Sequence, residues 1–121
     1  MKSDSANSNL KPADFLEQVR QAALLYPWIT QIESRVEGRV ARARLRLRRE
    51  GFVDLYYNAE TGSISFAYIE RGRRRFGANN MKIGWHLHPF DEPEEHRPSA
   101  PVTVREFLEL LAQELAGRGR I

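Results

Sequence analysis

The segment Val40-Ala41-Arg42-Ala43-Arg44-Leu45-Arg46-Leu47-Arg48 decides the fold, because it alternates strictly between apolar residues and arginines. Successive side chains of a β-strand point to opposite faces, so the pattern predicts an extended segment with one apolar and one basic face. We extend this period of two back to Ile32, which predicts one strand over residues 32–48.

Similar alternation follows downstream and predicts a meander of antiparallel strands. Phe52–Asn58, Ser63–Glu70 and Arg74–Ala78 are the next three strands, separated by short turns that contain Gly51, Gly62 and Gly72. Lys82–His88 is a weaker fifth strand, because Gly84 interrupts it and Pro89 ends it. The sheet is therefore expected to have four to five strands.

A helix is predicted on each side of the sheet segment. The first begins at Pro12, and Pro27 terminates it; its apolar residues recur at helical spacing, at Phe15, Leu16, Val19, Ala22, Ala23 and Tyr26. Thr103 and Glu106 form a capping box, so the second helix is expected to start at Val104 and to end at Gly117. The fold class is α+β, with an N-terminal helix, an antiparallel meander sheet and a C-terminal helix.

Length and composition indicate one domain. We expect a disordered tail over residues 1–11, a single α+β domain over 12–117 and a short basic tail over 118–121. The chain has no cysteine, which excludes disulfides, thiolate metal sites and thiol redox chemistry. It also lacks an apolar run of the roughly 20 residues that a membrane span needs, so we expect a soluble, cytoplasmic protein without membrane contact.

Arginines are concentrated in two places, although the net charge is only +3. Guanidinium groups suit bidentate phosphate contacts, so two strips are candidate nucleic-acid contacts: Arg42, Arg44, Arg46 and Arg48 in the first, Arg73 and Arg74 in the second. Two other interpretations stay open: a solvated edge strand protected by its charges, and a compositional bias of the genome.

The segment from Trp85 to His96 gathers all three histidines of the chain beside four carboxylates. On an extended strand His86 and His88 project from the same face. Two histidines and an arginine are sufficient for metal-free RNA cleavage, in which imidazoles act as base and acid and a guanidinium stabilises the phosphate. The candidate catalytic residues are His86, His88 and Arg75, with Arg74 as the alternative arginine and no cofactor.

The same histidines are also candidate metal ligands. His86 and His88, with His96 or Asp91 as the third ligand, would leave an open coordination position for water. Histidines that merely hydrogen-bond the loop are a third interpretation. The acidic residues of 91–95 are expected to form a solvated loop that pairs with arginines or docks a basic partner.

Several segments resemble the TumE-type toxins of prokaryotic toxin–antitoxin pairs. The resemblance covers Gly51 to Leu115 and depends mainly on Trp85-His86-Leu87-His88-Pro89 with the downstream His96-Arg97-Pro98. It implies a helix-turn-helix antitoxin as partner more firmly than it implies a reaction. Asn79-Asn80 stands where Asp-Asn occurs in the family, so a carboxylate of the family is missing here.

Together, the residues and the resemblance predict a toxin-like component that acts on RNA. The alternatives are a non-catalytic module that binds nucleic acid or protein, and a metal-dependent hydrolase that uses the His-x-His segment. Unpaired sheet edges could also pair with a second copy of the chain, which would make a homodimer.

Overall fold

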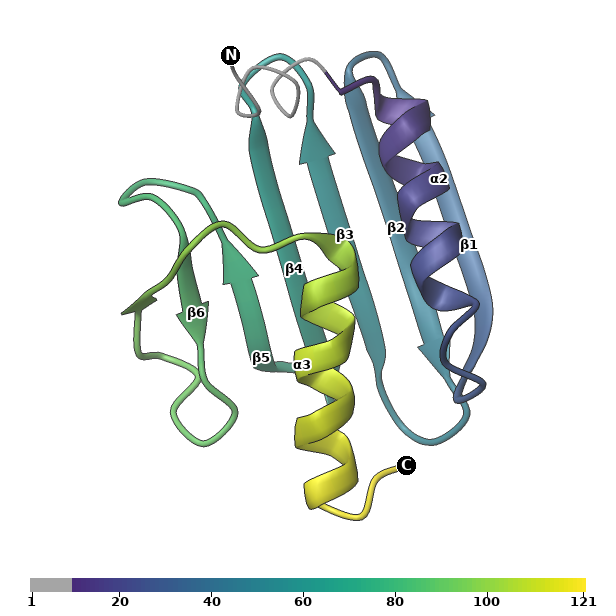
Figure 1. The fold of residues 1–121 in the computed structure, drawn as a ribbon, viewed down its shortest axis with the longest axis vertical. Helices are drawn as coiled ribbons and strands as arrows, with labels where there is room; N and C mark the ends of the chain where they lie inside the picture. Colours follow the sequence, from purple (N-terminus) through teal and green to yellow (C-terminus); the bar gives the residue numbers. More distant parts are fainter. Residues whose placement is uncertain (1–9) are drawn as a thin grey trace.

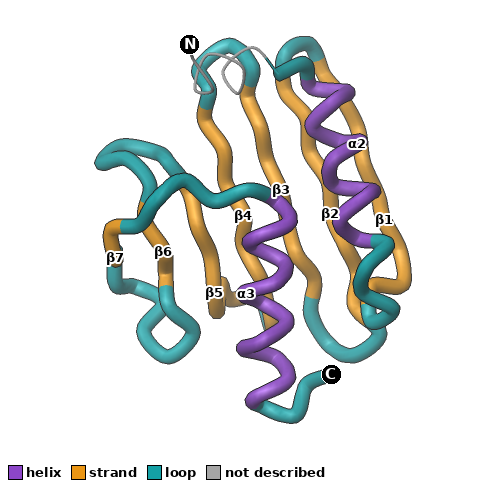
Figure 2. Tube along the Cα trace, in the orientation of Figure 1, coloured by secondary structure: helices purple, strands orange, loops and turns teal. Residues whose placement is uncertain are grey.

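Seven strands form one antiparallel sheet, and each strand pairs with its neighbours in the sequence (Figure 1, Figure 2). The computed structural model describes residues 10–121. The strands are β1 (Ile29–Glu37), β2 (Val40–Leu47), β3 (Phe52–Asn58), β4 (Ser63–Glu70), β5 (Arg73–Asn79), β6 (His86–His88) and β7 (Arg97–Pro98). The α+β class and the meander are therefore confirmed.

Both helices lie on the same face of this sheet. In Figure 1, α2 (Pro12–Ala23) lies over β1 and β2, while α3 (Val104–Gly117) lies over the middle of the sheet and contacts β4. The two helices also contact each other. Within residues 10–121, neither helix has the length and apolar character that crossing a membrane requires.

The alternating pattern of β2 explains why only one face of the sheet is covered. Ala41, Ala43 and Leu45 are buried beneath the helices, whereas Arg42 and Arg46 are exposed on the other face. The buried row continues across the sheet in register, from Ala43 through Leu55 and Phe66 to Ala78. We call the helix-covered side the inner face and the opposite side the outer face.

The prediction of a single strand over residues 32–48 is wrong. This segment belongs to a hairpin, in which β1 and β2 pair around a turn at Gly38, whose φ is +60°. Both strands have a period of two, but its phase changes at the turn, since Ile32 and Val36 of β1 share a face with Leu45 and Ala41 of β2. With β7, this hairpin raises the number of strands from the expected four or five to seven.

The fifth predicted strand is shorter than expected. Only His86–His88 forms β6, because Lys82 and Gly84 have positive φ angles of +65° and +89° and the chain turns there. Positive φ is incompatible with an extended strand. The histidine pair nevertheless lies on the strand, as predicted.

The predicted C-terminal helix is confirmed, including its start. The Thr103 hydroxyl accepts a hydrogen bond from the Glu106 N–H at 3.1 Å, and the Glu106 carboxylate accepts one from the Thr103 N–H at 2.9 Å. These two bonds satisfy amide groups that the first helical turn leaves without partners.

The two ends of the domain contact the rest of the molecule. The Tyr57 hydroxyl donates a 2.6 Å hydrogen bond to the Leu10 carbonyl. At the other end, the Arg118 guanidinium lies 3.9 Å from the centre of the Phe90 ring, and Arg120 forms a 3.0 Å ion pair with buried Glu70. Of the predicted disordered tail of residues 1–11, residues 1–9 lie outside the described residues, whereas Leu10 and Lys11 are described.

Gly51 is the glycine that the fold needs most, which gives a first prediction. Its φ is +107°, and a Cβ there would lie 2.9 Å from a ring carbon of Tyr68 and 3.1 Å from the Ile69 carbonyl. Gly51→Ala is therefore expected to lower the free energy of unfolding by about 3 kcal/mol. Urea denaturation monitored by circular dichroism measures this change.

Gly38→Ala is the matched control. Gly38 also has a positive φ, but nothing lies within 4 Å of a Cβ at this position. Its cost should be the backbone strain alone, about 1 kcal/mol. Equal losses of stability in the two variants would contradict the close approach of Tyr68 to Gly51.

Candidate functional site

The three histidines form a compact triangle. The ring centroids of His86 and His88 lie 4.9 Å apart, those of His86 and His96 4.9 Å, and those of His88 and His96 4.7 Å. One nitrogen of each ring can be chosen so that all three lie within 4.8 Å of one another. Residues that are neighbours in sequence thus become neighbours in space, as the sequence predicts for His86 and His88.

The strand register places this histidine triangle on the outer face. His88 pairs with Gly77 and His86 pairs with Asn79, in the rows that continue to the outward residues of β4 and β3. His86 and His88 are only 3% and 2% exposed, although no helix covers this face. His96, which precedes β7, is exposed. The triangle is therefore open to solvent through His96.

Hydrogen bonds fix the tautomer of His86. Its Nδ1 lies 2.8 Å from the Gly84 carbonyl oxygen. A carbonyl only accepts hydrogen bonds, so Nδ1 carries the proton and Nε2 has a free lone pair. The turn that ends β6 early supplies this carbonyl.

His88 has the same tautomer for a different reason. Its Nδ1 lies 3.1 Å from the Pro93 carbonyl oxygen, and its Nε2 lies 3.5 Å from the Asn79 side-chain nitrogen. The Asn79 oxygen accepts a 3.0 Å hydrogen bond from the Met81 N–H, so its amide nitrogen faces His88. An amide nitrogen donates, which leaves the Nε2 of His88 unprotonated.

Arg74 is the arginine that reaches the histidine triangle. Its Nη2 donates a 3.1 Å hydrogen bond to the Pro93 carbonyl and lies 3.2 Å from the His88 Nδ1. Gly77 makes room for this side chain, because a Cβ there would lie 3.2 Å from the Arg74 Cδ. Burial lowers the pKa of His88, and the charge of Arg74 and the neighbouring His86 and His96 lower it further.

Arg75, the predicted catalytic arginine, has other contacts. It lies 3.8 Å from buried Glu70, and its guanidinium is 5.4 Å from the centre of the Phe90 ring. Arg73 is exposed. All three arginines line one hollow of about 470 Å³, which also includes Pro93 and two carboxylates, Asp91 and Glu94. This hollow adjoins the triangle through Arg74 and Pro93.

Two of the four arginines of the predicted basic strip along β2 are paired with carboxylates. Arg44 makes a bidentate contact with Asp54, at 2.8 and 3.0 Å, and Arg46 makes one with Glu33, at 2.8 and 3.4 Å. Arg42 lies over the ring of Tyr56, and Arg48 donates to the Pro27 carbonyl. These arginines are not a continuous strip of unpaired charge, which weakens the case for a phosphate track there.

The acidic residues of the loop remain outside the triangle. Asp91 forms a 3.0 Å ion pair with Arg118, and Glu95 forms one with Arg97 at the same distance. A hydrogen bond from Glu92 to Glu95 raises the pKa of Glu92. Of the two predicted third ligands, Asp91 and His96, the described residues bring only His96 beside the histidine pair.

The arrangement fits a metal ion with three nitrogen ligands. In a tetrahedral zinc site the ligand nitrogens lie roughly 3.3 Å apart, so the triangle needs a small contraction from its present separations of up to 4.8 Å. Histidines that ligate metals usually donate their other N–H to a carbonyl or carboxylate, as His86 and His88 do here.

Sequence reasoning missed two residues of this site, Asn79 and Gly77. In the sequence, Asn79 is notable only because it differs from the TumE-type pattern. No sequence pattern indicates a role for Gly77. No protein-family model, curated protein or solved structure matches this chain. The resemblance to the TumE-type toxins therefore stays a prediction.

The hydrogen-bond pattern predicts the tautomers of two imidazoles. In metal-free protein at neutral pH, His86 and His88 should both carry their proton on Nδ1. Long-range proton–nitrogen NMR spectra distinguish protonated from unprotonated ring nitrogens and measure this directly. A protonated Nε2 in either ring would contradict the arrangement described above.

Proposed function

We propose that this chain is an RNA-directed toxin component whose reactive centre is a divalent metal ion, of the zinc class, held by His86, His88 and His96. One observation carries the metal centre: the Nδ1 atoms of two imidazoles are hydrogen-bonded to backbone carbonyls, so Nε2 is the nitrogen of each ring that is left for a metal, and a third imidazole lies beside them. The Nε2 of His88 would exchange a long, 3.5 Å hydrogen bond from Asn79 for the metal. Zinc prefers nitrogen ligands of this kind. The RNA target and the toxin role come from the resemblance and the arginines.

Three histidines leave a fourth coordination position for water. A zinc ion held by them would supply a water of lowered pKa as the nucleophile for hydrolysis of a phosphodiester bond. Arg74 is positioned to stabilise the added negative charge, because its guanidinium lies beside His88 and lines the adjoining hollow.

The metal-free mechanism is the less favoured alternative. It requires one histidine to be protonated so that it can act as the acid. Arg74 and the two other imidazoles all disfavour a positive charge on His88, and burial disfavours it more. A metal ion needs neutral imidazole ligands, so the lowered pKa of His88 does not count against it.

The partner in this proposal is a helix-turn-helix antitoxin, as the resemblance implies. An antitoxin with an acidic surface could contact accessible arginines, among them exposed Arg73, which lines the adjoining hollow. Binding there would cover the hollow next to the metal centre and so prevent access of RNA.

Metal binding is tested first with one ligand variant and one matched control. Chelator-treated protein should bind one Zn²⁺ per chain in calorimetry, and His96→Ala should weaken binding by roughly 100-fold or more. His96 is exposed, so its removal should leave the fold intact. Asp91→Ala is the matched control, because Asp91 is in the same loop but does not lie beside the histidine pair. This variant should bind Zn²⁺ with the affinity of the unaltered chain. Absence of stoichiometric binding by the unaltered chain would refute the metal centre.

Neighbouring arginines provide the test of activity. With Zn²⁺ and labelled RNA, Arg74→Ala should lower kcat/KM by about 100-fold, because it removes a guanidinium beside the metal. Arg75→Ala should change kcat/KM by no more than about 2-fold, because Arg75 contacts Glu70 and Phe90 instead.

The same assay in the presence of a chelator distinguishes metal-dependent cleavage from metal-free cleavage. Cleavage that disappears in chelator and returns with Zn²⁺ supports the metal centre. Cleavage that persists in chelator and is lost in His88→Ala would instead favour the metal-free mechanism. Binding of RNA without any cleavage would leave the chain a binding module and contradict the proposed activity.

A further inference from the structure

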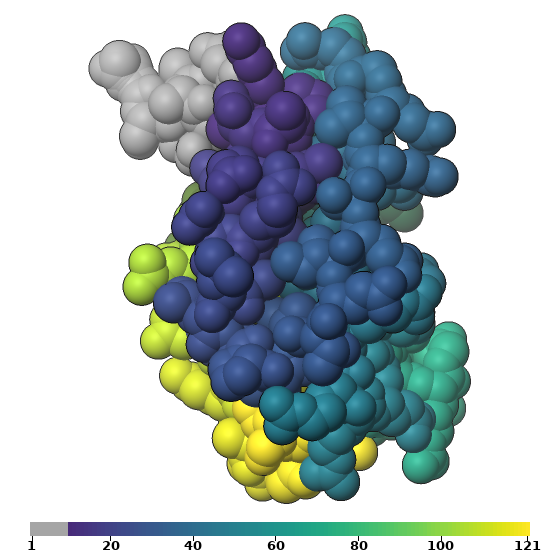
Figure 3. All heavy atoms as spheres, turned by 90° about the vertical axis from the view of Figure 1, so that its right-hand side faces the viewer, coloured from purple at the N-terminus to yellow at the C-terminus, as the bar shows by residue number. Residues whose placement is uncertain are grey.

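The two edges of the sheet differ greatly. At one edge, β7 has two residues and includes Pro98, which cannot donate a backbone hydrogen bond. At the other edge, β1 has nine residues, and eight of them are exposed. Figure 3 views the molecule from this side, where the residues of β1 and β2 form an open surface next to α2. A long open edge strand is a template for pairing with another chain.

We propose that β1 pairs with β1 of a second copy, antiparallel and in the register centred on Ser34. This arrangement joins two seven-stranded sheets into one continuous sheet. The proposal is independent of the metal centre, because β1 and the histidine triangle lie at opposite ends of the strand order.

The charges of β1 select this register. With Ser34 opposite Ser34, each Glu33 faces an Arg35 of the other copy, so two pairs of opposite charge form. A register centred on Glu33 would oppose two Glu33 side chains, and one centred on Arg35 would oppose two Arg35 side chains. Like charges directly opposite each other destabilise a sheet. The strand is therefore complementary to itself in the register that we propose.

The apolar residues of β1 agree with the charges. Ile32 and Val36 are 36% and 44% exposed, and both lie on the inner face, opposite Leu45 and Ala41 of β2. In the register centred on Ser34, Ile32 of each copy lies directly opposite Val36 of the other. Pairing thus buries the exposed apolar side chains of the strand against each other, in two equivalent contacts.

The ion pairs within one chain are compatible with this pairing. Glu33 already binds Arg46 on the outer face through a 2.8 Å contact, and it can add Arg35 of the second copy on its other side. Arg35 has a weaker, 3.7 Å contact with Glu37, and its side chain is 66% exposed. Its guanidinium is therefore available to a partner strand.

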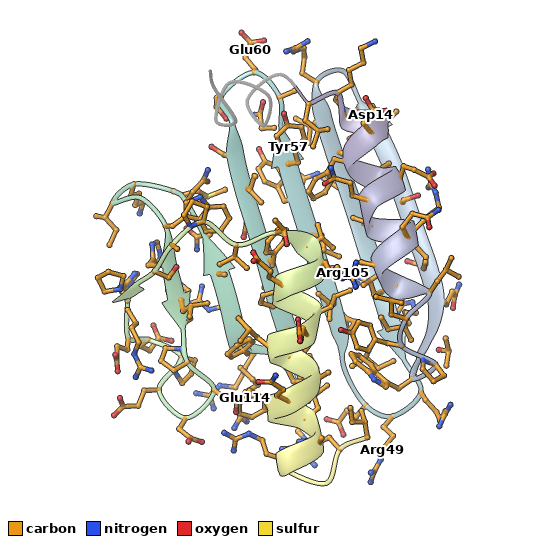
Figure 4. All side chains as sticks on the ribbon, in the orientation of Figure 1. Asp14, Arg49, Tyr57, Glu60, Arg105 and Glu114 are labelled. Atoms are coloured by element: carbon orange, nitrogen blue, oxygen red, sulfur yellow. The ribbon has the colours of Figure 1, made fainter. Side chains whose placement is uncertain are left out.

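The mass in solution tests the proposal. Sedimentation or light scattering should give twice the 14.0 kDa of one chain. Arg35→Glu places like charges opposite each other and should raise the dissociation constant at least 10-fold, whereas the double exchange Glu33→Arg with Arg35→Glu should restore pairing. Arg105→Glu makes the same charge change on α3, away from β1 (Figure 4), and should leave the dimer intact. A monomer at every concentration would overturn the proposal.

Cross-linking tests the register itself. The chain has no cysteine, so an introduced one has no competitor. Ser34→Cys should form a disulfide-linked dimer on mild oxidation, because the two residues are directly opposite and within the Cα separation that a disulfide spans. The Ile32→Cys variant alone should not cross-link efficiently. A mixture of the Ile32→Cys and Val36→Cys variants should cross-link, because these two positions are opposite each other in the proposed register. A dimer in which Ser34→Cys fails to cross-link would refute this register.

Discussion

The structure depends on one constraint: helices cover only one face of the sheet. Residues on the inner face can be apolar, as the row from Ala43 on β2 to Ala78 on β5 is. Residues on the outer face have to satisfy their polar groups with each other or with water. The pairs Arg44–Asp54 and Arg46–Glu33 do so across neighbouring strands, which explains why these two arginines of the strip are paired rather than free.

The histidine triangle is the exception on this outer face. Among the described residues there, burial is confined to His86, His88 and Gly77, the glycine beneath Arg74. Burying an imidazole is favourable only when its N–H has an acceptor, and the carbonyls of Gly84 and Pro93 supply one each. On the opposite side of the His88 ring, Nε2 accepts a long hydrogen bond from Asn79. The contacts that allow these rings to be buried therefore also fix their orientation.

Sequence reasoning succeeded where the cause is local and failed where it is not. Four strands and the α3 capping box follow from patterns of a few residues. The β1–β2 hairpin was missed because both strands have a period of two, although its phase changes at the turn around Gly38. The strand β7 was missed because two residues are too few to show a pattern. At the site, the closeness of His86 and His88 follows from their spacing. The choice of Arg74 over Arg75 does not, because it depends on the irregularity where β4 passes from Tyr68 to Ile69 and shifts its pairing with β5.

The position of His96 has a consequence for the loop that precedes it. His88 and His96 are separated by a stretch that contains two prolines and four carboxylates and forms little regular structure. An ion bound by both residues would act as a cross-link across this stretch, in a chain that has no cysteine with which to make one. Unlike a disulfide it would be released on unfolding, so it would stabilise the fold by binding only the folded state, and the folded state and the bound ion would stabilise each other.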